Sequence, residues 1–416
     1  MTSDTDQRRV ARSVSSTIAA RFAVVVCGLG TSIVSARVLG PAGRGQYFAV
    51  MTLGALFGQA LNLGLTSSNV LLGAQDHARL RPLLVNSLYI AVFFGIVGAA
   101  IVFVWGRHFA ARLDLPVSFL FAVCAIGATI LFWNLAGSLL MAVERFHTMN
   151  VWQLLNALAS LAGVVACAFF RAGSPGFVLA AALAAGSTAV GIFCFMIAGN
   201  KGTWTFSWEL VHRALGFSSR AYLALVFGYF LQRAGAAVMT VRGQASALGE
   251  YSIASQAFDV LLIVPASVST VLFPFLVRTG EASWPQVRQA ARYTVLLMLA
   301  ACSAAAIAAP WAVPLLFGKQ YAAAVPVLWA LLPAVMAYTV VSVLSQYLVM
   351  RDFPWSLVTV WAIGLALAYG AAGALTRLHG ATGAAIGQSF GAAFVCAGVL
   401  VIIGYRLHPR LRRDQV

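Results

Sequence analysis

Charged residues are scarce in this sequence. Of its 416 residues only 9% are charged, while 61% are hydrophobic and the mean hydropathy is +0.89. A soluble domain carries roughly 25% charged residues, so a water-soluble fold could not cover so much apolar surface. Lipid as the solvent removes the difficulty, because apolar side chains then face outward without cost. The composition predicts a membrane protein, and the length allows about twelve helices of roughly 20 residues.

Metal-binding and redox patterns are missing. The six cysteines lie in apolar runs and form no C-x-x-C pair, and the six histidines show no H-x-x-x-H spacing. We therefore expect no metal and no cofactor. A cleavable signal is also missing: the first 20 residues carry Arg8, Arg9 and Arg12 without a small-residue cleavage site. The first apolar run is expected to remain as a helix.

Long extramembrane loops are absent as well. The longest break between apolar runs is about 17 residues, 199–215, with no paired carboxylates, nucleophile motif or nucleotide-binding loop. A membrane-embedded polysaccharide polymerase or glycosyltransferase would need such a loop. The sequence therefore disfavours an enzyme, which we keep as the alternative of a different class.

Apolar runs separated by charged or Gly/Pro breaks predict twelve spans and an all-α polytopic fold. The predicted spans are 17–37, 46–73, 86–106, 117–142, 151–171, 176–198, 216–240, 249–277, 291–317, 325–349, 355–376 and 382–405.

The basic residues indicate the orientation. The net charge is +16, but these residues are spread between the spans, so we expect no nucleic-acid partner. Of 27 Lys and Arg residues, 18 fall on the side of the N-terminus, 8 on the other side, and Arg233 inside a span. The positive-inside rule places both termini in the cytoplasm. An even number of spans also puts the termini on one side.

The two halves resemble each other at an offset of about 204 residues. Gly-Gln-Tyr ends at Tyr47 and Gly-Glu-Tyr ends at Tyr251, and further Arg, Pro and Gly positions match in order. Six spans in each half make the repeat parallel, an architecture that transporters use. We predict a cytoplasmic tail (1–16), an N-lobe (17–200), a C-lobe (201–405) and a basic cytoplasmic tail (406–416).

Four motifs resemble those of bacterial oligosaccharide flippases, the polysaccharide transporters of the multidrug/oligosaccharidyl-lipid/polysaccharide exporter superfamily. Residues 36–47 read ARVLGPAGRGQY, like that family's first loop, and residues 62–68 read NLGLTSS. In the second half, LGEYSIA at 248–254 and LFGKQY at 316–321 are similar to later marks of the family. The resemblance covers nearly the whole chain.

The resemblance implies two six-helix lobes that form a V around a central cavity. It implies movement of an undecaprenyl-diphosphate-linked oligosaccharide from the inner to the outer leaflet of the bacterial inner membrane. The product would serve O-antigen, capsule or exopolysaccharide synthesis, beside a polymerase and glycosyltransferases. Many relatives carry an aspartate in the seventh span, whereas this chain reads QRAG at 232–235. The mode of ion coupling is therefore open.

A cation- or proton-coupled drug antiporter of the same superfamily is the nearest alternative. Such a protein would need carboxylates inside the first lobe. Here Asp76 and Asp114 fall in loops and Glu144 at the end of a span. The sequence thus favours an anionic headgroup over a cationic drug.

Arg233 and Asp259 are the main candidates for the substrate site. An ionisable residue inside a span is a functional hypothesis by default, and arginine binds phosphate oxygens bidentately. Asp259, in the eighth span, is expected at a similar depth, so a purely structural ion pair is equally compatible. Gln256 precedes it on the same helical face. Proton coupling through Asp259 is a further possibility.

Other candidates have simpler explanations as well. Arg21 and Arg220 could collect the diphosphate at the cytoplasmic mouth and Arg37 could stand at the exit, but snorkelling to headgroups would also explain them. Three amide side chains could contact sugar or simply hydrogen-bond between helices: Gln59, Asn62 and Asn134.

Overall fold

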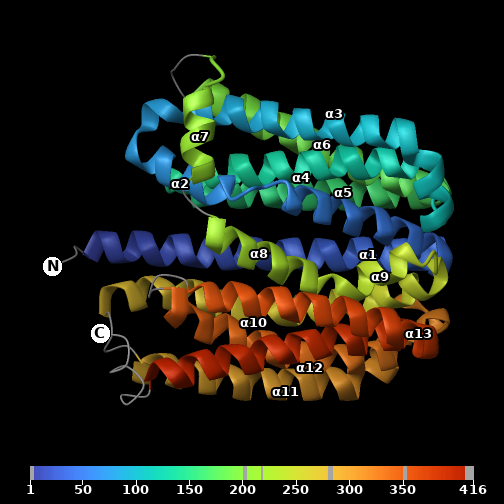
Figure 1. Ribbon diagram of the computed structural model, residues 1–416. Coiled ribbons are helices and arrows are strands. Elements are labelled where there is room, and N and C mark those ends of the chain that lie inside the picture. Colours follow the sequence, from blue (N-terminus) through green and yellow to red (C-terminus); the bar gives the residue numbers. More distant parts are fainter. Residues whose placement is uncertain (1–3, 200–203, 217–218, 280–283, 350–353, 408–416) are drawn as a thin grey trace. The chain divides into compact units, whose positions relative to one another are not determined.

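The computed structural model describes residues 4–199, 204–216, 219–279, 284–349 and 354–407, and every regular element within them is helical (Figure 1). The α-helices are α1 (Asp4–Ala60), α2 (Leu65–Gln75), α3 (Leu80–Leu113), α4 (Val117–Ala142), α5 (Phe146–Phe169), α6 (Gly173–Gly199), α7 (Trp208–Gly216), α8 (Ser219–Gln232), α9 (Ala234–Val241), α10 (Ala245–Thr279), α11 (Trp284–Phe317), α12 (Ala324–Val349) and α13 (Trp355–Leu407). The prediction of an all-α membrane fold is confirmed.

The number of spans agrees with the prediction once the breaks are considered. Among the described residues, nine helices are long and apolar enough to cross a membrane, and α8 with α9 forms a tenth as a pair bent by 62°. Two of the nine, α1 and α13, contain a non-helical glycine that divides each into two arms, at Gly40 and Gly380. If each arm is counted separately, the described residues hold twelve apolar helical segments, close to the predicted places.

The first glycine break is a reversal of the chain. Arg44 donates to the hydroxyl of Ser32 at 2.9 Å and to that of Ser35. In a continuous helix, residues 32 and 44 would lie about 18 Å apart, so the arms of α1 must fold back on each other. Gly40 has φ +66°, which suits glycine because it lacks a Cβ. The family-like stretch 36–47 thus builds a hairpin.

The second break, at Gly380, is a closer hairpin. Its φ is +53°, and the two arms of α13 meet through glycines spaced four apart, Gly383, Gly387 and Gly391. A Cβ added at Gly387 would collide with the backbone of Ala372. Small residues let helix backbones approach in this way within a membrane.

The chain divides into two compact units, residues 1–219 and 220–416. In unit 1, α4 is the central helix, packed against α1, α2, α3 and α6, and its Leu131, Leu135 and Leu139 are fully buried. In unit 2, α12 packs against α10, α11 and α13. The V of the two lobes and the cavity between them stay predictions.

The segment 199–215, which we predicted as a loop, contains the amphipathic helix α7. It belongs to unit 1, so the division between the units falls after residue 219 and not after residue 200. Because α7 is only nine residues long and carries charge, a search for apolar runs does not find it.

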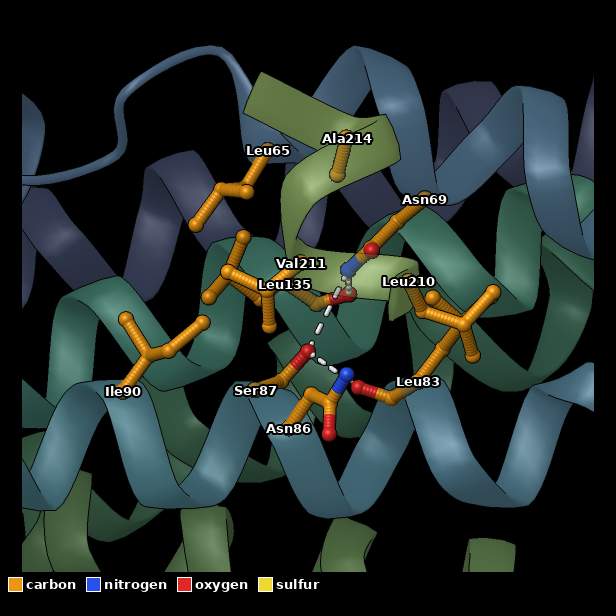
Figure 2. A pocket seen from close by; sticks show the side chains of 10 residues that line it. All are labelled: Leu65, Asn69, Leu83, Asn86, Ser87, Ile90, Leu135, Leu210, Val211 and Ala214. Carbon is orange, nitrogen blue, oxygen red and sulfur yellow. Dashed lines mark hydrogen bonds between the residues drawn. The ribbon is translucent and has the colours of Figure 1, made fainter. Parts of the chain in front are cut away.

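Hydrogen bonds to the rest of unit 1 hold α7 at both of its ends. Asn86 accepts from the backbone N–H of Ser207 and donates to the Ser207 carbonyl, both at 2.9 Å. Ser68 donates to the carbonyl of Ala214 at 2.7 Å. Beneath the helix, Asn69 donates to Ser87 in a cavity of about 10 Å³ (Figure 2). Leu210 and Val211 close this cavity from the side of α7.

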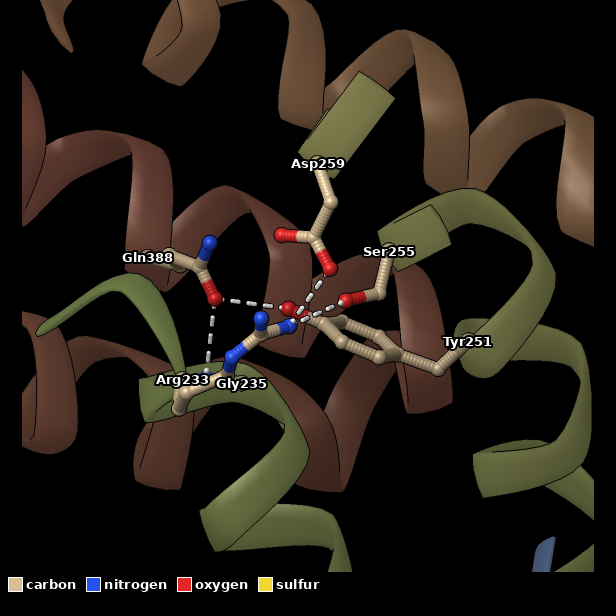
Figure 3. Close-up of polar contacts among 6 residues, drawn as sticks. All are labelled: Arg233, Gly235, Tyr251, Ser255, Asp259 and Gln388. Carbon is tan, nitrogen blue, oxygen red and sulfur yellow. Dashed lines mark hydrogen bonds and ion pairs between the residues drawn. The ribbon is translucent and has the colours of Figure 1, made fainter. Parts of the chain in front are cut away.

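The seventh span is broken at Arg233, and the break exposes a backbone donor. The N–H of Gly235 donates to the side-chain oxygen of Gln388 at 3.2 Å, and the Tyr251 hydroxyl donates to the same oxygen at 2.7 Å (Figure 3). Inside a membrane an unsatisfied backbone group costs several kcal/mol. Gln388, from the second arm of α13, therefore makes the break tolerable.

We expect Asn86→Ala to loosen α7. It removes two hydrogen bonds worth about 1 kcal/mol each, so amide exchange across residues 208–216 should rise about 30-fold. Ser207→Ala is the control, because it removes only the cap that accepts from the Leu210 N–H. Its effect should be about five-fold. Equal protection of α7 in Asn86→Ala and the native protein would contradict the anchoring role.

We expect Gly235→Ala to destabilise unit 2. An added Cβ would lie 2.7 Å from Cζ of Tyr251 and overlap its hydroxyl, and overpacking of this kind costs about 1–3 kcal/mol. Gly370→Ala in α13 is the control, since no atom of the residues that the structure describes lies within 4 Å of its Cβ position. The thermal unfolding midpoint in detergent measures both. If the unfolding midpoint of Gly235→Ala were as high as that of Gly370→Ala, the Tyr251 side chain would move aside without loss of stability. The prediction would then be wrong.

Candidate functional site

The break between α8 and α9 presents Arg233 to α10. Nη1 of Arg233 lies 3.0 Å from Oδ2 of Asp259 and also donates to the hydroxyl of Ser255 at 3.2 Å (Figure 3). The guanidinium carbon is 5.9 Å from the centroid of the Tyr229 ring, one turn earlier in α8. The predicted meeting of Arg233 and Asp259 is thus present in the structure, within unit 2.

This ion pair is only partly buried. The side chain of Arg233 is 19% exposed and that of Asp259 is 39% exposed. Charges inside a span normally face a protein interior or a water-filled cavity, because hydrocarbon cannot solvate them. A guanidinium has several N–H donors, and both bonds to α10 use Nη1 alone, so donors remain for an oxyanion. The pair can therefore be structural and still bind an anion.

A rigid cluster supports the pair. Tyr251, Ser255 and Asp259 follow one another at intervals of four along α10, so all three lie on one face of this helix. Tyr251 is 1% exposed and is fixed by Gln388. Phe258 is also fully buried. The face of α10 that carries Asp259 is therefore held in place by the core of unit 2.

Aromatic side chains continue from this cluster. Tyr338 of α12 packs edge-on against Phe258, with ring centroids 6.0 Å apart, and stacks on Trp361 of α13 at 6.4 Å. Its hydroxyl is buried and has no hydrogen-bond partner among the residues that the structure describes. A buried polar group of this kind is rare in a native protein. Together with Arg233, it makes this part of unit 2 the strongest candidate for ligand contact.

The remaining predicted residues are dispersed. Gln256 is half-buried on α10 beside the cluster. In unit 1, Arg37 is exposed in the α1 hairpin, while Gln59 and Asn134 are half-buried. The side chains of Arg21 and Arg220 lie outside the described residues. Arg37, Gln59 and Asn134 belong to unit 1, whereas Arg233 belongs to unit 2. Their part in substrate binding stays a prediction.

Asn62 has a local role. It is 6% exposed and its amide donates to the hydroxyl of Thr66 at 2.7 Å, while its oxygen accepts from the Thr66 N–H at 3.2 Å. These bonds stabilise the turn that bends the second span before α2. These bonds lie within one span, so they are not the bonds between helices that we considered, and the contact of Asn62 with sugar stays a prediction.

Sequence reasoning missed three polar residues that shape these sites. Ser255 and Tyr251 had a detectable signal, since they precede Asp259 at helical spacing. Arg44 had none: it falls between the first two predicted spans, yet it is 5% exposed and lies 5.6 Å from the Tyr47 ring. Its serine partners belong to the preceding arm, and no local pattern predicts which residues of that arm it meets.

Solved structures of transporters share this fold. The lipid II flippase MurJ in an inward closed conformation matches 93% of this chain and 87% of its own, with TM-score 0.74 and 14% identity. An inward-facing multidrug resistance MATE family transporter of the MOP superfamily matches 94% and 96%, with TM-score 0.70 and 15% identity. The MATE multidrug transporter DinF-BH matches 96% and 95%, with TM-score 0.67 and 14% identity.

Sequence comparison identifies the family. No curated protein matches the chain. The family model described as "Polysaccharide biosynthesis protein" matches residues 34–326, which include the α1 hairpin, Arg233 and Asp259. This match covers more than half of a chain whose helices span the membrane many times, and the protein therefore belongs to the polysaccharide biosynthesis protein family.

Proposed function

We propose that this protein is a flippase for a lipid-linked oligosaccharide. Its substrate is an undecaprenyl-diphosphate-linked oligosaccharide, which it moves from the inner to the outer leaflet of the bacterial inner membrane. The observation that carries the proposal is the match to a polysaccharide biosynthesis family over residues 34–326. The fold supports it, since the lipid II flippase MurJ has a similar one.

The hydrogen-bond donors of the candidate site fit an anionic headgroup. A diphosphate must cross a region of low dielectric constant, where an arginine replaces water around the phosphate oxygens. Arg233 stands inside a span, partly exposed, with Ser255 beside it. In the described part of unit 1 downstream of residue 21, the carboxylates lie at the ends of helices or in α7: Asp76, Asp114, Glu144 and Glu209.

The orientation and partners belong to the same proposal. The excess of arginine on the side of the N-terminus supports cytoplasmic termini and residence in the inner membrane. The translocated sugar would pass to a polymerase, and glycosyltransferases would supply it, in O-antigen, capsule or exopolysaccharide synthesis.

A drug antiporter remains the second candidate. It is favoured by one observation, the similarity in fold to MATE multidrug transporters at TM-scores of 0.70 and 0.67. Asp259 could then carry the coupling proton, after release from Arg233.

Reconstitution separates the two functions. The purified protein is placed in liposomes that contain a fluorescent undecaprenyl-diphosphate sugar, and a membrane-impermeant quencher reports the sugar that reaches the outside. We expect transfer well above that of protein-free liposomes. A parallel assay follows uptake of a cationic dye driven by a pH gradient. Dye uptake without sugar transfer by a folded sample would refute the flippase and favour the antiporter.

We expect Arg233→Ala to reduce sugar transfer at least about ten-fold, because the headgroup loses its cation inside the span. Arg233→Lys should be intermediate, since lysine keeps the charge without the planar fork. Arg233→Ala also leaves Asp259 unpaired, which lowers stability by about 1–3 kcal/mol.

The double variant Arg233→Ala/Asp259→Ala separates stability from transport. It should regain expression and thermal stability, because no unpaired charge remains, but it should still transfer sugar slowly. Normal transfer by the double variant would make the pair purely structural and remove Arg233 from the mechanism.

A further inference from the structure

Unit 1 carries an apolar groove that the proposed function does not use. Its volume is about 230 Å³, and it lies between α3, α4 and α6. Ala91 and Val92 form one wall, Phe132 the floor, and Gly186 and Val190 the other wall. The groove is wide because its α6 wall includes a glycine whose Cβ position meets nothing within 4 Å.

The groove is open at the surface of unit 1 and apolar. Val92 is 47% exposed and Val190 is 63% exposed, and both belong to helices that are long and apolar enough to span a membrane. The hydroxyl of Thr129, which also lines the groove, donates to the carbonyl of Ala125 at 2.8 Å and so offers no free donor. A hydrocarbon chain is the ligand that such a surface accommodates without desolvating any polar group.

A cation stands beyond one end of this groove. Phe193 lines the groove and contacts the Trp204 ring edge-on, with centroids 6.0 Å apart. The guanidinium carbon of Arg81, near the start of α3, lies 4.5 Å from the centroid of the same Trp204 ring. Groove, tryptophan and arginine thus follow one another along the ends of α3 and α6.

This order matches the parts of a phospholipid. Tryptophan favours the boundary between headgroups and chains, and an arginine at that level attracts anionic headgroups by about 1 kcal/mol. A second cation lies nearby, since Nη1 of Arg145 is 3.7 Å from the Cβ position of Gly199, the last residue of α6. Positive charge at this end favours an anionic over a zwitterionic headgroup on electrostatic grounds.

We propose that unit 1 binds an anionic phospholipid, with its phosphate at Arg81, its glycerol region beside Trp204 and one acyl chain in the groove between α3, α4 and α6. The lipid comes from the leaflet that holds the start of α3. This site is independent of the flippase function, because it requires only the described residues of unit 1 and a bilayer.

Native mass spectrometry tests the proposal. The full-length protein is stripped of lipid in detergent and titrated with dioleoyl-phosphatidylglycerol or dioleoyl-phosphatidylcholine, and the bound lipid is counted. We expect tighter retention of phosphatidylglycerol. Arg81→Gln should weaken this retention about five-fold, which corresponds to about 1 kcal/mol for one surface arginine. Arg79→Gln is the matched control, since it removes the same charge two residues away from a side chain that contacts Asp76, at 3.1 Å, and not the Trp204 ring.

A second pair of variants tests the groove. Gly186→Leu places a side chain in the open space and should reduce retention of phosphatidylglycerol at least about five-fold. Ser187→Leu adds the same side chain at the next, exposed position outside the groove and should leave retention unchanged. Thermal unfolding confirms that each variant is folded. If Arg81→Gln does not fold, Arg81→Lys replaces it, with an expected intermediate retention.

Three results would overturn the proposal. Equal retention of the two phospholipids would refute the role of charge. Matching behaviour of Gly186→Leu and Ser187→Leu would refute the groove. Displacement of phosphatidylglycerol by an equal concentration of undecaprenyl phosphate would assign the groove to a polyprenyl chain, and the phospholipid assignment would then be wrong.

Discussion

The need to satisfy polar groups without water governs how the interrupted helices of this structure are held. Hydrocarbon offers no hydrogen bonds, so each break in a helix and each charge must find a partner within the protein. Arg44 finds two serines across the α1 hairpin, and the N–H of Gly235 finds Gln388. Arg233 finds Asp259 and Ser255. Polar residues of the membrane-spanning segments therefore lie where the helices are interrupted. The candidate functional site lies at one of these interruptions.

The same requirement explains why the candidate site is well ordered. The broken seventh span could not exist without an acceptor for its free N–H, and Gln388 supplies that acceptor while it also fixes Tyr251. Tyr251 in turn belongs to the face of α10 that carries Asp259. One side chain from α13 thus links the backbone break to the ion pair. Arg233 owes its position to residues that are distant in sequence.

The sequence predicted the features that depend on solvent and periodicity. Apolar runs located the twelve spans, and the expected depths of Arg233 and Asp259 were enough to bring these two side chains together. The bend of 62° at Arg233 was not predictable, because QRAG contains no proline and its glycine is tolerated in a membrane helix. The helix α7 was missed because it is short and amphipathic. The partners of Arg44 were not predicted, because the sequence does not say which residues of the two arms meet across the reversal.

The glycines of α13 have a mechanical consequence. Gly383, Gly387 and Gly391 bring the two arms so close that side chains no longer separate their backbones. Sliding or separation of such arms would open a void along their whole length, whereas a looser pair could adjust by changing rotamers. The two arms of α13 should therefore move together as one rigid body. Any shape change inside this unit must then be absorbed by elements other than the contact between these two arms.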